Sequence, residues 1–269
     1  MSWLKRQRKA SRAEKTGLAT FLAAILLSCT SSPQLANLPL ALFLLICLAA
    51  PFFPRSSFFL PVVWRGRPDS RGIALTFDDG PFPASTPIIL ELLARYRLPA
   101  TFFVVGKHAE AHPELIAAIL AQGHTIGNHS LRHDNLLMLR KGEAIEADIA
   151  RTQEILGQMG VRPLFFRPPI GITSPRLQSP LASQNMQAMT FSSRIFDHGN
   201  RRIHNFASRV LRQVNPGDIL LLHDNPPLTE DQRKYWQEEL EQLFAHFARE
   251  KKVVPLAELI GQPVMLQVK

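Results

Sequence analysis

The fold of this chain is decided by the stretch GIALTFDDGP at residues 72–81. Its apolar run predicts a short buried strand, and the paired carboxylates with Gly-Pro predict that this strand ends in a turn. Further apolar runs predict strands at 101–105, 125–126, 164–166, 188–191, 218–222 and 253–254. Between these strands, apolar residues recur at helical spacing, which predicts helices at 87–96, 113–122, 142–159, 205–214 and 230–250. Strands that alternate with helices predict a parallel α/β domain, either a barrel or an open sheet.

The composition fits one folded domain with an N-terminal addition. Of the 269 residues, 46% are hydrophobic and 20% are charged, which is enough for the core of a domain of about 200 residues. These values exclude a disordered chain, a collagen-like repeat and a disulfide-rich miniprotein. The two cysteines, Cys29 and Cys47, both lie in an apolar N-terminal region, which excludes a disulfide framework or a thiolate metal site in the folded domain.

The net charge of +9 is concentrated near the N-terminus, where residues 1–15 hold six basic side chains and one acidic side chain. No basic stripe with interleaved aromatic residues follows, which argues against a nucleic-acid partner. A basic cluster directly before an apolar run is instead typical of a membrane flank.

Two apolar runs, at 18–29 and 38–53, follow this basic cluster. Each run is shorter than the about 20 residues of a comfortable membrane span, and prolines in and after the polar turn at 31–37 would break a single long helix. We therefore expect a membrane-associated helical hairpin. The expected division of the chain is a basic flank at 1–16, two apolar segments at 17–54, a linker at 55–70, a catalytic domain at 71–262 and a tail at 263–269.

Alternatives for the N-terminal segment stay open. The stretch Leu26-Leu27-Ser28-Cys29 loosely matches the cleavage site of a lipidated signal peptide. A second alternative is one anchored span followed by a segment that lies at the membrane interface. A third is a hairpin buried in the core of a soluble protein. Basic residues such as Arg55 and Arg65 after the hairpin favour a cytoplasmic domain, whereas a signal peptide or one span would place the domain outside. We expect a bacterial-type cytoplasmic membrane, with the side of the domain undetermined.

Polar side chains follow four of the predicted strands, at the edge where parallel α/β folds place their chemistry. Asp78 and Asp79 are adjacent carboxylates whose repulsion a nearby cation would remove; a simple turn is the alternative. His129 and His133 are four residues apart, so if the segment is helical the two imidazoles lie on one face, as a divalent metal needs. Two surface histidines are the alternative. Together with a carboxylate from another strand end, His129 and His133 would form a catalytic His2Asp metal centre.

The other two strand ends carry a basic side chain. Arg167 directly follows the predicted strand at 164–166 and needs a carboxylate partner, for which Asp78 is a candidate. His223 ends another strand and is a natural acid/base group, whose pKa Asp197 could raise. The alternatives are a surface arginine before a proline turn and a histidine packed in the core or at the rim.

In this order the four segments resemble the polysaccharide deacetylases, the NodB-homology domain of carbohydrate esterase family 4. The resemblance covers about residues 72–259. It is carried by TFDDGP at 76–81, HSLRH at 129–133, RPP at 167–169 and LLH at 221–223. Four motifs in this order are a specific signal.

The resemblance implies a distorted (β/α) barrel and a divalent metal, usually zinc, with cobalt, nickel or manganese as alternatives. It implies that the metal ligands are Asp79, His129 and His133. Asp78 would be the general base, Arg167 would orient it, and His223 would be the general acid. The backbone N–H of Ile170 would help to hold the oxyanion, and Leu221 would line the pocket for the acyl methyl group.

The sequence departs from the family pattern at two places. Ile170 stands where family members usually carry an aromatic residue. In FSSRIFDH at 191–198, Asp197 is retained but His198 replaces a tryptophan. Both changes remove aromatic surface on which polymeric sugars would stack, so they bear on the substrate more than on the reaction.

We therefore expect a metal-dependent hydrolase that removes an N-acyl group, expected to be N-acetyl, from an amino sugar. The substrate is either a polymer, such as peptidoglycan, a chitin-like glycan or an exopolysaccharide, or a lipid-linked saccharide at the membrane. The alternative is a non-catalytic, membrane-anchored protein that binds glycans or glycolipids. The substitution Asp78→Asn discriminates the two, because only an enzyme should lose a rate. The oligomeric state stays open.

Overall fold

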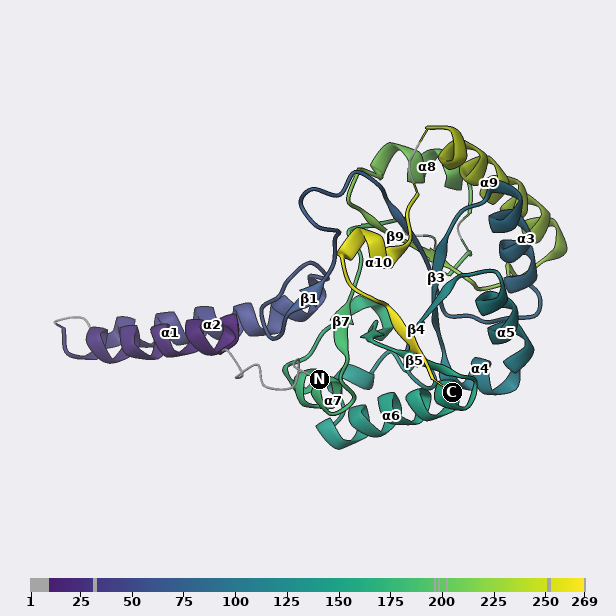
Figure 1. Ribbon diagram of the computed structural model, residues 1–269. Coiled ribbons are helices and arrows are strands. Elements are labelled where there is room, and N and C mark those ends of the chain that lie inside the picture. Colours follow the sequence, from purple (N-terminus) through teal and green to yellow (C-terminus); the bar gives the residue numbers. More distant parts are fainter. Residues whose placement is uncertain are drawn as a thin grey trace.

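The computed structural model describes residues 10–30, 33–195, 197, 199–201, 203–250 and 253–268. Most of the basic flank (residues 1–9), the turn residues Ser31 and Ser32, and His198 lie outside the described residues. A rounded domain, in which helices surround a curled sheet, carries a pair of helices that projects from one side (Figure 1).

The main sheet has eight strands in the order β1-β7-β6-β4-β3-β2-β9-β8, and each neighbouring pair runs parallel. Their bounds are β1 (Val62–Val63), β2 (Ala74–Asp78), β3 (Ala100–Val104), β4 (Thr125–Asn128), β6 (Phe165–Phe166), β7 (Gln187–Met189), β8 (Ser193–Arg194) and β9 (Ile219–His223). The predicted parallel α/β class is confirmed, and the sheet curls into an incomplete barrel rather than an open sheet (Figure 1).

Strand β2 has one face in the apolar core and the other face toward the site. All five of its residues are buried, as is typical of a strand in a parallel sheet covered on both faces. Because side chains alternate along a strand, Leu75 and Phe77 pack into the large apolar cluster under the outer helices. Thr76 and Asp78 point to the opposite face, where both bond Arg167. The same strand therefore stabilises the core and presents a carboxylate.

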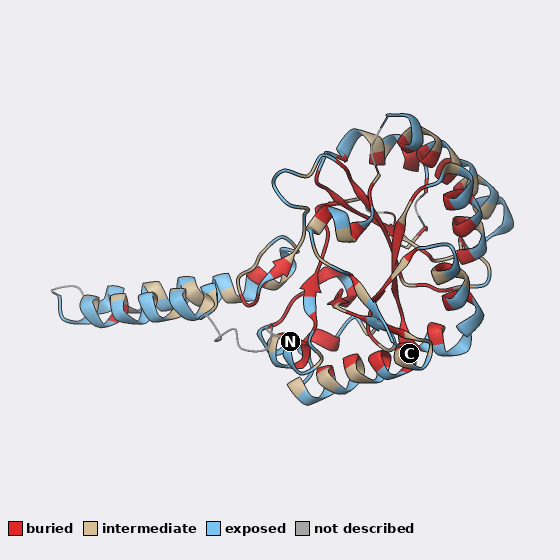
Figure 2. Ribbon diagram, viewed as in Figure 1, coloured by how far each residue is buried: buried red, intermediate tan, exposed pale blue. Residues whose placement is uncertain are grey.

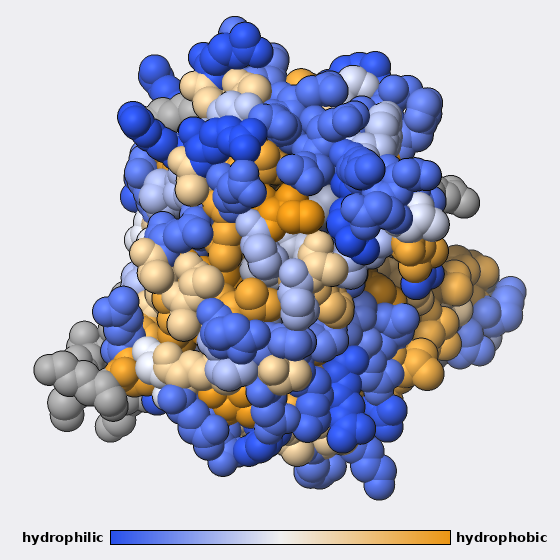
Figure 3. Space-filling model, turned by 90° about the vertical axis from the view of Figure 1, so that its right-hand side faces the viewer, coloured by the Kyte–Doolittle hydropathy of each residue, from blue (hydrophilic) through white to orange (hydrophobic). Residues whose placement is uncertain are grey.

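Eight α-helices follow β1 among the described residues. They are α3 (Thr86–Tyr96), α4 (Gly106–Ala111), α5 (Pro113–Ala121), α6 (Gly142–Gln158), α7 (Gln178–Ser183), α8 (Phe206–Gln213), α9 (Glu230–Glu250) and α10 (Leu256–Ile260). The long helix α9 buries Trp236 and Phe244 completely, and Phe244 meets Phe77 edge-on at 6.4 Å. Buried residues line the inner side of the helices in Figure 2. Figure 3 shows the side of the domain on which α3, α5 and α9 lie, and hydrophilic side chains cover most of it.

The structure differs from the expected division of the chain at both ends of the domain. Residues 55–70, expected to be a linker, contribute β1, which pairs with β7. Residues 263–269, expected to be a tail, contribute β10 (Met265–Gln267), which pairs antiparallel with β5 (Val161–Pro163). In place of the strand expected at 253–254, Val253 forms a single bridge with Ile73. Strands of two or three residues are too short to show a two-residue period in the sequence.

The projecting pair consists of α1 (Arg12–Ser28) and α2 (Asn37–Ala49), which lie side by side (Figure 1). Two short 3-10 helices, η1 (Pro33–Ala36) and η2 (Ala50–Phe52), flank α2. The continuous helical run Pro33–Phe52 is 20 residues long; an 18-residue stretch of it has a mean hydropathy of 2.2, and 6% of that stretch is buried. Within the described ranges it is the one helix long and apolar enough to cross a membrane. This exposure contradicts the alternative of a buried hairpin in a soluble core.

Candidate active site

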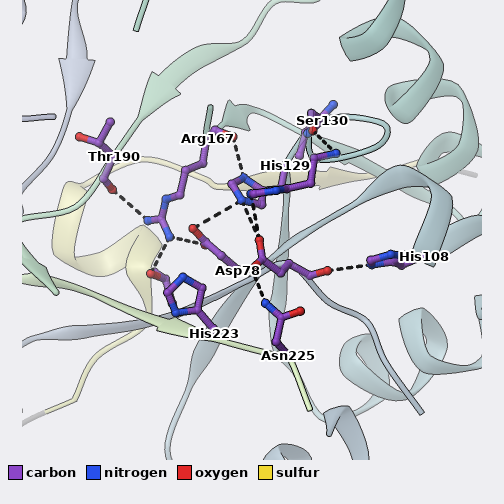
Figure 4. Close-up of polar contacts among 12 residues, drawn as sticks. Asp78, His108, His129, Ser130, Arg167, Thr190, His223 and Asn225 are labelled. Carbon is purple, nitrogen blue, oxygen red and sulfur yellow. Dashed lines mark hydrogen bonds and ion pairs between the residues drawn. The ribbon is translucent and has the colours of Figure 1, made fainter. Parts of the chain in front are cut away.

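All predicted site residues except Arg167 line one cleft of about 690 Å³ at the carboxyl ends of the parallel strands, and Arg167 lies buried in contact with Asp78. Asp78 is the last residue of β2 and His223 the last residue of β9, and the two are paired in the register. His129 directly follows β4, and Arg167 directly follows β6. Figure 4 shows these side chains turned toward one another. The placement follows from the fold, because parallel strands bring their carboxyl ends to the same edge.

Asp79, His129 and His133 form a compact group within this cleft. Oδ1 of Asp79 lies 3.3 Å from Nε2 of His129 and 3.2 Å from Nε2 of His133. The helix that would place both histidines on one face is absent: residues 129–133 form a loop in which Ser130 and His133 have positive φ of 72° and 51°. The Ser130 hydroxyl accepts a hydrogen bond from the backbone N–H of His133 at 3.0 Å. The condition of a helical segment is therefore not met, and a turn brings the imidazoles together.

This group fits a divalent cation. Its three ligand atoms lie within 4.8 Å of one another, and Oδ1 of Asp79 is buried with no hydrogen-bond partner among the described residues. Nδ1 of His129 is hydrogen-bonded to the carbonyl of Arg167 at 2.7 Å. A carbonyl only accepts, so the neutral imidazole has its lone pair on Nε2, which faces Asp79. Two imidazole nitrogens and one carboxylate oxygen suit zinc and the neighbouring transition metals.

The charges in the group are also arranged for a cation. Burial raises the pKa of the Asp79 carboxyl, but its close approach to the imidazole of His129 outweighs burial, and the pKa lies well below its usual range. Burial lowers the pKa of His129, but the charges of Asp78 and Asp79 raise it above its usual value. Burial and the charge of His129 lower the pKa of His133. Two carboxylates therefore create a site that favours one positive charge.

Arg167 holds Asp78 in place. Its Nη1 donates to Oδ1 of Asp78 at 2.6 Å and to the Thr76 hydroxyl at 2.8 Å, and its Nη2 donates to the carbonyl of Thr190 at 2.9 Å (Figure 4). The guanidinium also lies 3.9 Å from the centre of the Phe103 ring. Arg167 is fully buried and Asp78 is 4% exposed, so each charge depends on the other for compensation.

His223 is held by Asp197 at another part of the cleft. Nδ1 of His223 lies 2.9 and 3.0 Å from the two carboxylate oxygens of Asp197. Burial lowers the pKa of His223, but the hydrogen bond and charge of Asp197 outweigh it and raise the pKa to about 9. His223 lines the cleft, so with Nδ1 engaged its Nε2 is the nitrogen left for a substrate. This imidazole is protonated at neutral pH.

The two expected substrate contacts form walls of the same cleft. Leu221 lies two residues before His223 on β9 and is 5% exposed. Ile170 belongs to the short 3-10 helix η4 (Pro169–Gly171), has a φ of 52° and is 48% exposed. Both residues line the cleft, together with Phe191.

Sequence reasoning missed several residues that hold this site. Asn225 donates from Nδ2 to Oδ2 of Asp79, and its carbonyl accepts from Asn200 at 2.7 Å. Nδ1 of His108 contacts the carbonyl of Asp79 at 2.8 Å. His108 and Asn225 both come soon after strands, so a wider search past the strand ends would have included them. Thr190 carries no such signal, because it bonds Arg167 through its backbone carbonyl.

Asp224 supports the turn that carries Asp79. It is fully buried, its backbone N–H donates to the carbonyl of Asp78 at 2.8 Å, and its Oδ2 accepts from the Thr86 hydroxyl at 2.6 Å. A Cβ added at Gly80 would lie 2.1 Å from Oδ2 of Asp224. Glycine is therefore required in this turn because the Asp224 carboxyl occupies the space of a side chain. Burial raises the pKa of Asp224 to about 7.

Known proteins share this sequence and fold. A family model described as polysaccharide deacetylase matches residues 65–189. A chitooligosaccharide deacetylase of Sinorhizobium fredii is 35% identical over 173 residues, 63% of this chain and 79% of that protein. A peptidoglycan-N-acetylglucosamine deacetylase of Bacillus cereus is 33% identical over 165 residues, 61% of this chain and 77% of that protein. The crystal structure of a peptidoglycan N-acetylglucosamine deacetylase has a TM-score of 0.67 at 29% identity, and the match covers 76% of this chain and 94% of that one.

Proposed function

Because this chain belongs to the polysaccharide deacetylase family and is a hydrolase of N-acetyl amide bonds, we propose that it removes the acetyl group from an N-acetylated amino sugar with the help of a divalent metal. One observation carries this proposal: a single cleft holds Asp78 bonded to Arg167 at 2.6 Å and His223 bonded to Asp197 at 2.9 Å. A carboxylate fixed as a base and an imidazole kept protonated are the two groups that amide hydrolysis requires.

Asp79, His129 and His133 would hold the metal, zinc in the first place, with cobalt, nickel or manganese as alternatives. When bound, the ion would supply Lewis acidity toward the amide carbonyl and toward water. The protein prepares this site through outer contacts: Asn225 holds the second oxygen of Asp79, and the carbonyl of Arg167 orients His129.

In the proposed reaction, Asp78 accepts a proton from the water whose oxygen attacks the amide carbon. A C–O bond forms, and the carbonyl electrons move onto oxygen, which the backbone N–H of Ile170 would help to stabilise. The C–N bond then breaks as His223 donates its proton to the leaving nitrogen. The products are acetate and a free amine on the sugar. Leu221 would form the wall against the acetyl methyl group.

Arg167 and Asp197 act through these two residues. Arg167 keeps one oxygen of Asp78 engaged, so the other oxygen, 3.7 Å from Nε2 of His129, is available for the proton. Asp197 keeps the imidazole of His223 charged and fixes its orientation. Each partner therefore fixes the orientation of a reacting group before substrate arrives.

We further propose that α1 and α2 attach the enzyme to a bacterial-type cytoplasmic membrane. The support is the run Pro33–Phe52, whose length and hydropathy suit a span. Exposed leucine and phenylalanine side chains cover the rest of the hairpin, including Leu18, Phe21 and Leu26 on α1. Large apolar patches of this kind are unfavourable in water.

The test is acetate release by the purified full-length protein, in detergent with added zinc, from N-acetylglucosamine oligomers and from an N-acetylglucosaminyl lipid. Wild type should release acetate, and Asp78→Asn should release none. Asp231→Asn, an acidic residue of the exposed first turn of α9, is the matched control and should behave as wild type. Equal behaviour of wild type and Asp78→Asn would favour a non-catalytic binding protein.

A further inference from the structure

The segment that follows the hairpin is linked to the proposed base, Asp78, through Thr190 and Arg167. The apolar run ends at Phe52, and the carbonyl of Pro54, two residues later, accepts from the Thr190 hydroxyl at 2.5 Å. The backbone carbonyl of the same threonine accepts from Arg167, which holds Asp78. One residue therefore connects the end of the hairpin with the arginine of the active site.

A wall of the cleft adjoins the same segment. A side chain at Gly171 would lie 3.8 Å from Cβ of Pro54, and Gly171 and Ile170 both line the cleft. Arg55 donates to the carbonyl of Ser192 at 2.5 Å, next to the cleft residue Phe191. The cleft thus opens beside the place where the chain leaves the hairpin.

Exposed apolar side chains extend from the base of the hairpin along this side of the cleft. We call Phe52, Phe53, Leu136, Leu139 and Ile170 the apolar rim; their exposures are 68, 62, 61, 71 and 48%. Leu137 and Met138, between the two rim leucines, are buried in the same cluster as Ala50 of η2. Asn135, next to Leu136, lines the cleft. The segment that carries Leu136 and Leu139 is therefore packed in the same cluster as the end of the hairpin and adjoins the cleft.

The cleft lacks the surface that a long free glycan would use. Among its lining residues that the structure describes, Phe191 is the one aromatic side chain other than histidine. Aromatic rings supply the large flat contacts on which sugar rings stack. The exposed apolar side chains at the cleft are instead aliphatic, Ile170 and Leu228, and further exposed apolar side chains lie on the rest of the rim, where a lipid would be.

Resting on the proposed deacetylase function, we propose that the apolar rim lies on the bilayer surface and that the substrate is an N-acetylated amino sugar carried by a membrane lipid. Insertion of Phe52 and Phe53 with the hairpin brings the rim to the interface, where leucine and phenylalanine side chains are favourable. The cleft then faces sugars that project only a short distance from the membrane. Enzyme and substrate share one surface, which raises the effective concentration of each for the other.

The experiment uses the full chain reconstituted in vesicles of phosphatidylethanolamine and phosphatidylglycerol. Acetate release is measured from an N-acetylglucosaminyl polyprenyl lipid in those vesicles and from soluble chitotetraose. We expect kcat/KM to favour the lipid by about tenfold or more. Leu136→Asp with Leu139→Asp should lower the rate on the lipid by about fivefold and leave the rate on chitotetraose unchanged. Leu266→Asp, an exposed leucine on β10, is the control and should change neither rate.

The outcomes separate this inference from the proposed function. Deacetylation of chitotetraose at the same or a higher rate than the lipid overturns the lipid-linked substrate and leaves the deacetylase intact. Failure to deacetylate either substrate overturns both. A loss on the lipid that Leu266→Asp shares would also overturn the role of the rim.

A second measurement does not depend on activity. The variants Leu139→Trp and Leu266→Trp keep an apolar side chain, and brominated phosphatidylcholine quenches tryptophan fluorescence only within the bilayer. Above the wild-type background, the signal added by Leu139→Trp should be quenched and that added by Leu266→Trp should not. Equal quenching of the two, or none at position 139, overturns the placement of the rim.

Discussion

Asn225 donates a hydrogen bond to Oδ2 of Asp79, while Oδ1 of the same carboxylate faces Nε2 of both His129 and His133. The two oxygens therefore have separate roles. Asn225 fixes the plane of the carboxylate, and it is fixed in turn through its own carbonyl by Asn200, which is buried. A ligand oriented in this way loses less freedom when an ion binds.

Asn225→Ala should weaken zinc binding by about 10- to 100-fold, because it frees Oδ2 of Asp79 to rotate away from the imidazoles. Competition with a fluorescent zinc chelator measures the change in Kd. Asn135→Ala is the matched control, since Asn135 lines the same cleft without a contact to Asp79 among those the structure describes. Equal zinc affinity of the Asn225 variant and wild type would contradict the role of Asn225.

Removal of metal should abolish activity without unfolding the domain. The core under the outer helices consists of apolar residues that do not include Asp79 or either histidine, so a chelator should leave the far-ultraviolet circular dichroism unchanged. Addition of zinc should restore acetate release. His133→Ala should need a higher zinc concentration for the same rate, because it removes one of three ligands. Full activity after exhaustive chelation would refute the metal site.

The rate should fall on the alkaline side as His223 loses its proton. The pKa of this imidazole is raised to about 9, so the general acid is present throughout the neutral range and is lost as the pH rises through about 9. The contribution of the Asp197–His223 pair to folding stability follows the same direction. Because the pKa is raised on folding, this contribution is fully present below a pH of about 6.5, the ordinary pKa of histidine, and is lost as the pH rises through about 9.

Asp197→Asn should move this alkaline limb to lower pH by about one unit or more, because the opposing charge is gone while burial still disfavours the imidazolium. The pH profile of kcat measures the shift. Asp69→Asn, at an exposed carboxylate near the start of the domain, should leave the profile in place. An alkaline limb that does not move in Asp197→Asn would exclude His223 as the group that titrates.

Arg167→Met should destabilise the protein by about 3–5 kcal/mol, because it leaves the buried carboxylate of Asp78 without a compensating charge. Urea unfolding measures this loss. The double variant with Asp78→Asn should recover a large part of the stability but none of the activity, since the base is then absent. Additive losses in the double variant would contradict the coupling between these two residues.

Gly80→Ala should cost about 1–3 kcal/mol, because its Cβ would overlap Oδ2 of Asp224 and force the turn that carries Asp79 to shift. Gly157→Ala is the matched control. No atom lies within 4 Å of an added Cβ at Gly157, and this position in α6 should gain up to about 1 kcal/mol from helix propensity. Thermal unfolding of the two variants should therefore give shifts of opposite sign.

The sequence by itself determined the α/β class, most of the long helices and strands, and which strand ends carry the polar side chains that meet at the cleft. These features depend on spacing over a few residues: continuous apolar runs for buried strands and a period of 3.6 for helices. Asp78, His129, Arg167 and His223 each stand at or directly after such a strand, so their common edge follows from a parallel sheet.

Only the tertiary structure decided how these groups meet. A turn with positive φ at Ser130 and His133, which no spacing rule indicates, brings the two imidazoles to Asp79. Thr190 and Asn225 reach the site through contacts with residues more than twenty positions away in the chain. The order of the strands sets such contacts, and strand order depends on packing of the whole domain rather than on local periodicity. For the same physical reason, the position of the hairpin beside the cleft could be read only from the folded chain.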